Sequence, residues 1–162
     1  WAAENLTTGR SNIGTQFRLA SDPVVVNLLQ DGVERSQHVF GRNSNGDLIH
    51  YYWFPSRSWA AENLTTGRSN IGTQFRLASD PVVVNLLQDG STKEWSQRVF
   101  GRSSKGDLIH YHWSPSTSWS AENLTTGWPD TGTQFRFVSD PVTLDCPNLD
   151  EEGRAYCTFP NF

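Results

Sequence analysis

Three residue types that can hold a small polar ligand recur at matched positions along this 162-residue chain. They are arginine, tryptophan and glutamate, at Arg42, Trp53, Trp59 and Glu62, and again at Arg102, Trp113, Trp119 and Glu122. A sugar offers hydroxyl groups to charged hydrogen-bonding partners and a C–H face to an aromatic ring, so this combination predicts a monosaccharide pocket. The alternative is structural, because tryptophans also pack between sheets and Arg–Glu pairs can join neighbouring units.

No catalytic or cofactor motif accompanies these residues. The chain lacks a nucleophile elbow, an HExxH pair and a phosphate-cradling glycine loop. Residues 43–47 have the Asn-x-Asn-x-Asp spacing of a calcium loop, but Lys105 stands among the corresponding residues of the second copy. The histidines on the expected hairpin strands, His50, His110 and His112, show no base–nucleophile pair or metal-ligand set. We therefore expect no catalytic residue, no metal and no cofactor.

Internal repeats position all of these residues. Residues 1–32 return unchanged as residues 59–90, and a third copy begins at Trp119. Between the copies, residues 36–53 are closely matched by residues 96–113. Self-similarity of this length is the sequence signature of a repeat architecture. We therefore treat residues 1–162 as a single repeat domain, with repeats starting at 1, 59 and 119 and the last one truncated before a cysteine-containing tail, residues 145–162.

Each repeat is expected to contain four short strands, which in the first copy are SDPVVVNLL, SQHVFGR, GDLIHYYW and WAAENLT. The run Val24–Leu29 is β-branched and short, which is typical of a buried strand. Asn45-Gly46 lies between two apolar runs and predicts a tight hairpin turn. Four antiparallel strands per repeat predict an all-β fold built of β-propeller blades.

The strand count predicts about three blades per chain. Residues 1–7 would form a leading fourth strand, Ser139–Leu144 a trailing first strand, and the tail the strands that are missing between them. Propellers usually close with about four to eight blades, and an open ring leaves exposed sheet edges. We therefore expect a six-bladed ring formed by a homodimer. A monomer with another three-part β arrangement and a fragment of a longer chain are the alternatives.

The composition limits the binding partners and the cellular compartment that can be expected for this chain. The 13 basic and 17 acidic residues form no block of like charge, and no apolar run approaches the ~20 residues of a membrane helix, so neither nucleic acid nor membrane insertion is expected. Cys146 and Cys157 have the spacing of a local disulfide, which favours secretion; two free buried thiols are the alternative. The sequons at Asn5, Asn63 and Asn123 are interpreted mainly as strand and turn residues.

A further arginine recurs in the repeated Gln-Phe-Arg, and an aspartate follows four residues later in every copy. These arginines could line the ligand pocket or form ion pairs. We expect ion pairs, joining Arg18 to Asp22, Arg76 to Asp80 and Arg136 to Asp140.

The pieces VFGRNSNGDLIHYYW, SWAAENLT and SDPVVVNLL resemble the blade repeats of bacterial and fungal propeller lectins, the group of fungal fucose-binding and Photorhabdus-type lectins. The resemblance covers most of the chain up to about residue 144. It implies a ring of six or seven blades in which an arginine, a glutamate and a tryptophan hold the sugar. The residues that match by type are Arg42 with Trp53 and Glu62, and Arg102 with Trp113 and Glu122.

Taken together, these features predict a secreted, multivalent lectin that binds glycans or glycoproteins in repeated inter-blade pockets, without catalysis. Fucose or a related monosaccharide is the expected ligand. A protein–protein interaction propeller is the first alternative. A glycan-processing enzyme is the second, and near-identical repeats argue against it because a unique catalytic centre usually breaks repeat symmetry.

Overall fold

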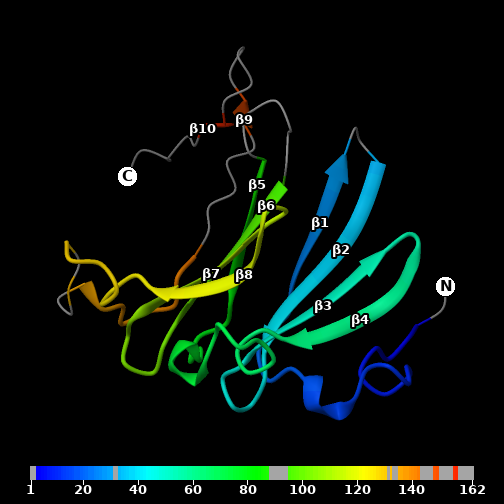
Figure 1. Ribbon diagram of the computed structural model, residues 1–162, viewed down its shortest axis with the longest axis horizontal. Helices are drawn as coiled ribbons and strands as arrows, with labels where there is room; N and C mark the ends of the chain where they lie inside the picture. The colour runs from blue at the N-terminus through cyan, green and yellow to red at the C-terminus, as the bar shows by residue number, and fades with distance from the viewer. Residues whose placement is uncertain are drawn as a thin grey trace.

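The computed structural model describes residues 3–30, 33–87, 95–130, 132, 135–142, 148–149 and 155–156, of which 28–30, 33–35, 86–87, 95, 148–149 and 155–156 are described by their backbone only. Two four-stranded antiparallel sheets dominate this part of the chain (Figure 1). No helix in these residues is long and apolar enough to cross a membrane. The all-β prediction is confirmed.

Each sheet contains the four strands of one predicted blade, paired in chain order. The first blade consists of β1 (Val24–Gln30), β2 (Val33–Arg42), β3 (Leu48–Phe54) and β4 (Arg57–Asn63). The second consists of β5 (Val82–Leu87), β6 (Trp95–Arg102), β7 (Leu108–Ser114) and β8 (Thr117–Asn123). The register repeats: Phe40 pairs with His50 in the first blade, and Phe100 with His110 in the second. The two blades lie side by side, and β1 contacts β5 (Figure 1).

The described residues form two complete blades, not the three expected. Residues 3–5 lie outside any strand. A fourth blade strand pairs with the third strand of the same blade, and the described chain places no such strand beside these residues. At the other end, residues 139–142 are not part of a strand, and a short pair, β9 (Asn148–Leu149) with β10 (Ala155–Tyr156), is all that is described of the tail. Both cysteines of the expected disulfide lie outside the described residues.

The predicted strand at Val24–Leu29 is confirmed, but its burial is not. Val25 is 60% exposed, because side chains alternate between the two faces of a strand and no described element covers this face. The β-branched run therefore reflects strand formation rather than a fully buried strand.

Local sequence determines the tight turns. Gly46 and Gly106 have φ near +86° and +85°, in the region that favours glycine, which explains why the second copy can replace Asn45 by Lys105 and keep the hairpin. The asparagine of each Asn-Leu-Thr-Thr-Gly segment holds a second turn. Asn63 Oδ1 accepts hydrogen bonds from the next two threonine N–H groups, and Asn5 and Asn123 do the same.

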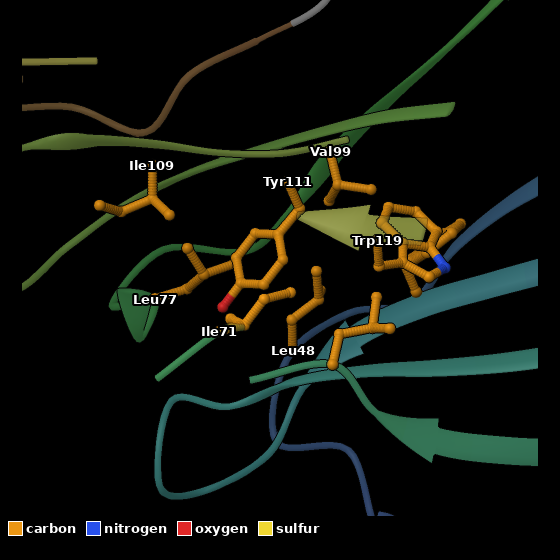
Figure 2. Packing of buried hydrophobic residues seen from close by; sticks show 9 residues of the cluster. Leu48, Ile71, Leu77, Val99, Ile109, Tyr111 and Trp119 are labelled. Atoms are coloured by element: carbon orange, nitrogen blue, oxygen red, sulfur yellow. The ribbon is translucent and has the colours of Figure 1, made fainter. Parts of the chain in front are cut away.

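The main core lies between the blades (Figure 2). Leu48 comes from the first blade, Val99, Tyr111 and Trp119 come from the second, and Leu77 comes from the segment that joins them. We call residues 64–81 the connector; it includes the short helix η2 (Thr73–Phe75). Figure 2 shows the ring of Tyr111 between Leu77 and Trp119. The connector is thus part of the core and not a loose link.

Ion pairs fasten the segment that follows each blade to the hairpin of that blade, with partners that differ from those predicted. Arg76 Nε donates to Asp47 Oδ1 at 2.8 Å, and Arg136 contacts Asp107 in the same way. Burial alone would raise the pKa of Asp47, but hydrogen bonds from Arg76 and two asparagines outweigh it and keep the pKa below its ordinary value. The expected pairing of Arg76 with Asp80 is wrong, because the connector crosses the hairpin turn at Arg76 and brings a distant carboxylate closer.

Candidate functional site

A pocket of about 230 Å³ lies between the two blades, and we call it the inter-blade pocket. The first blade and the connector contribute His38, His50, Tyr52, Phe54, Glu62 and Arg68, and the second blade contributes Gln97, Trp113 and Trp119. Three of the lining residues are at alternate positions of β3, which places their side chains on one face of the strand. A larger hollow beside the N-terminal loop has Arg18 as the sole charged residue in its described lining, so it lacks paired charges.

Glu62 and Arg68 form an ion pair at the wall of this pocket. Arg68 Nη2 donates to Glu62 Oε2, and Arg68 Nη1 donates to Ser118 Oγ of the second blade at 2.8 Å. Both side chains remain about one quarter exposed, at 29% for Arg68 and 25% for Glu62. The pair therefore joins the two blades and still presents charged hydrogen-bonding atoms to the solvent.

Behind Glu62 lies a chain of buried hydrogen bonds that fixes its carboxylate. His50 Nδ1 is 3.0 Å from Glu62 Oε1, His50 Nε2 is 2.8 Å from His38 Nδ1, and His38 Nε2 is 2.8 Å from Ser36 Oγ. Burial lowers the pKa of both histidines, that of His38 to about 3, so both are neutral near pH 7. With Nδ1 protonated on each ring, every contact has one donor and one acceptor: Ser36 donates to His38, His38 to His50, and His50 to Glu62.

This chain also sets the charge of Glu62. Burial by itself would raise the pKa of the carboxyl group. The hydrogen bonds from His50 and Arg68 outweigh that effect and hold the pKa below its ordinary value. Glu62 is therefore a carboxylate near neutral pH, with its orientation fixed from behind.

Aromatic side chains form the rest of the wall. Trp119 is only 3% exposed, and its ring stands edge-on to His50 with centroids 5.6 Å apart, so it supports the pocket from beneath. Trp113 and Tyr52 are partly buried, and Phe54 is 37% exposed. The apolar faces available to a ligand are therefore those of Trp113, Tyr52 and Phe54.

The structure brings some of the predicted ligand-binding residues together and separates others. Glu62, Trp113 and Trp119 line the inter-blade pocket. Arg42 lies elsewhere, 3.8 Å from Asp80, and Arg102 forms an ion pair of 2.9 Å with Asp140. These aspartates were the expected partners of the arginines that follow Gln-Phe.

The two remaining tryptophans of the predicted set also lie outside this pocket. Trp53 pairs with Gln37 at the far end of β3, and Trp59 packs against the smaller core cluster of Ile13, Ile49 and Tyr51. The triad of Arg42, Trp53 and Glu62 is therefore not assembled here, since strand pairing carries Arg42 to the opposite end of the blade from Trp53.

Arg68 and the histidine chain are the functional candidates that the sequence did not identify. A usable signal for Arg68 was present: Glu62 and Arg68 have the same spacing as Glu4 and Arg10, whose side chains also pair, at 2.7 Å. The histidines gave no such signal, because their partners come from neighbouring strands.

Related groups occur at two other places along the chain. Beside the first blade, Asn12 Nδ2 donates to Trp59 O at 2.7 Å, as Asn70 does to Trp119 O at 2.8 Å. On the second blade Glu122 stands at the position of Glu62, and Trp128 replaces Arg68. Of these three places, the inter-blade pocket alone has a complete blade on each side within the described part of the chain.

Comparisons with known proteins match this geometry at the level of fold. Residues 36–82, from β2 to the first residue of β5, match a family described as a repeat of unknown function (DUF346). No curated protein matches the sequence. A solved structure of a fucose lectin from Kordia zhangzhouensis, in complex with methyl-fucoside, is similar with a TM-score of 0.50 and 19% identity, over 66% of this chain and 67% of that one. The predicted resemblance to fucose-binding lectins is thus confirmed in the fold, which is similar to that of a fucose lectin.

Proposed function

We propose that the chain is a carbohydrate-binding protein and that the inter-blade pocket holds one monosaccharide unit. The observation that carries this proposal is the Glu62–Arg68 pair beside the partly exposed ring of Trp113. Glu62 can accept from one sugar hydroxyl and Arg68 can donate to another, while an aromatic ring covers the C–H face. Fucose or a related monosaccharide is the proposed ligand, since a structurally similar lectin binds methyl-fucoside.

The dimensions and charges of the pocket favour binding over catalysis. Its volume, about 230 Å³, is below the roughly 300 Å³ at which pockets for larger ligands begin, so it suits a single ring. Glycoside hydrolysis generally requires two carboxyl groups in one site, and Glu62 is the one carboxylate among the described lining residues. We therefore infer a lectin and not a glycosidase.

Multivalency and ring closure are further parts of the proposal. The Glu4–Arg10 pair and the Glu122 position each present half of a related pocket, which a neighbouring blade would complete. A homodimer that forms a closed ring would provide such blades and would raise avidity on clustered glycans. Secretion would place such a protein where glycoproteins are displayed.

A glycan array with the purified chain, followed by competition with free monosaccharides, tests the proposal. Arg68→Ala removes a charge-assisted hydrogen bond of about 1.5–3 kcal/mol, so affinity is expected to fall about 10- to 150-fold. Arg42→Ala is the matched control, because Arg42 is a partly exposed, ion-paired arginine outside the pocket. Absence of glycan binding would refute the lectin proposal, and loss of binding in Arg42→Ala alone would place the site elsewhere.

A further inference from the structure

We infer that the second blade carries a site for a divalent transition-metal ion, formed by His110, His112 and Glu122. One ligand atom from each of these three side chains lies within 4.8 Å of the other two. Imidazole nitrogens with a carboxylate oxygen are the ligand types that suit Zn²⁺ rather than Ca²⁺ or Mg²⁺. This inference is independent of sugar binding in the inter-blade pocket, because none of these three side chains lines that pocket. At Glu122 itself, an ion and a sugar would compete for the same carboxylate.

Strand geometry places the three ligands. His110 and His112 are two residues apart on β7, so both point to the same face of the sheet. Glu122 on β8 is the direct cross-strand partner of His110. This arrangement needs no loop movement, because neighbouring strands of one hairpin hold all three residues.

The distances fit a small ion after modest side-chain rotation. His110 Nδ1 is 2.9 Å from Glu122 Oε1, and His112 Nδ1 is 4.0 Å from the same oxygen. In a tetrahedral zinc site with bonds of about 2.0–2.1 Å, ligand atoms lie roughly 3.3 Å apart, between these two values. Three protein ligands leave one position for water or another donor.

Unused nitrogen atoms are the second observation. Among the described residues, His110 Nε2 and His112 Nδ1 are buried and have no hydrogen-bond partner. His112 Nδ1 is thus free to bind an ion, and His110 can carry its proton on Nε2 and offer Nδ1 as the ligand atom. In the first blade the corresponding His50 uses both nitrogens, one with His38 and one with Glu62. In the second blade Arg98 stands at the position of His38, and His112 stands at the position of Tyr52. The hydrogen-bonded chain of the first blade is therefore replaced by a group of side chains that can chelate an ion.

One neighbouring charge opposes a cation. Arg98 is the cross-strand partner of His112, and its positive charge acts on both histidines. No arginine in the described part of the chain pairs with Glu122, because Trp128 stands at the position of Arg68, and Trp128 Nε1 donates to Glu122 Oε2 at 3.2 Å. The carboxylate is thus held by neutral donors, which leaves its negative charge for an ion.

The test is a titration of the tag-free chain with Co²⁺, followed by visible absorption, and with Zn²⁺, followed by calorimetry. One ion per chain is expected, with the intense visible bands of four-coordinate Co²⁺. His112→Tyr inserts the residue that the first blade has in the same register, so it should fold normally. Its affinity is expected to fall at least about 10-fold, since losing even a supporting residue of a metal site costs that much. Glu122→Gln should weaken binding similarly.

His38→Gln is the comparison variant, because it changes a histidine of the first blade and should keep one ion per chain. Arg98→Gln removes the opposing charge and should strengthen binding. Absence of an ion in the unaltered chain, or unchanged affinity in both His112→Tyr and Glu122→Gln, would overturn the inference. Loss of the ion in His38→Gln with retention in His112→Tyr would overturn it as well, because the ion would then lie in the first blade.

Discussion

Tyr111→Phe is the most informative single change for stability, because it removes one buried hydroxyl group and keeps the ring. Tyr111 is fully buried between the blades (Figure 2). Its hydroxyl donates to Phe75 O at 2.9 Å and lies 2.6 Å from Thr65 Oγ1. Since its single proton goes to Phe75, Thr65 donates to Tyr111, and Thr65 Oγ1 accepts from the Leu48 N–H at 2.9 Å.

The size of the loss follows from the two partners that remain. Without the hydroxyl, the Thr65 O–H and the Phe75 carbonyl lose a buried partner, and each unsatisfied group costs about 1–3 kcal/mol. Some relaxation reduces the sum, so we expect the free energy of unfolding to fall by about 2–3 kcal/mol. For a chain of this length that corresponds to a melting temperature lower by about 4–12 °C.

Urea unfolding and thermal melting of the variant measure this loss. Tyr52→Phe is the control, since Tyr52 lies on the same type of strand, is partly buried, and its hydroxyl makes no hydrogen bond among the described residues. Its stability is expected to change by less than about 0.5 kcal/mol. If Tyr111→Phe were as stable as this control, the Tyr111 hydroxyl would not fasten the connector to the blades, and the assignment of this hydrogen-bond network to stability would be refuted.

Two further predictions concern pH and assembly. Burial lowers the pKa of all four histidines, His38, His50, His110 and His112. Below pH ~6.5 the unfolded chain binds protons that the folded chain does not, so the melting temperature should fall between pH 7 and pH 5, and less so in His38→Gln; a flat profile would contradict this. For assembly, light scattering is expected to give about twice the chain mass of 18.2 kDa, and a stable monomer would rule out the dimeric ring.

The blade was largely predictable because its signals are local or repeat exactly along the chain. The turn at Gly46, the alternation on β3 and the recurrence of both pieces gave four strands in the right order. Counting segments does not show whether each strand has a partner: residues 3–5 have none in the described chain, and most of the tail that would complete a third blade lies outside it. The ion pairs were misassigned for a similar reason: Arg76 contacts Asp47, 29 residues away, and not the nearby Asp80.

The sequence predicted the types of residue in the candidate site but not which individual residues meet there. Glu62 belongs to the second copy and Trp119 begins the third, and the pocket forms where one copy meets the next. Arg42 is the residue type expected in a sugar site, but it lies at the end of β2 opposite to the end that pairs with Trp53. The set that actually meets depends on which blade packs against which, and a single repeat does not contain that information.

The first two copies separate what sequence determines from what tertiary structure decides. In both, Asn-Leu-Thr-Thr-Gly forms the same turn, with the asparagine side chain capping two N–H groups, because every partner lies within four residues. The residues identical to 3–5 form the end of strand β4 in the second copy, yet residues 3–5 form no strand in the first. Strand hydrogen bonds must come from a neighbour, and β3 lies beside only one of the two copies.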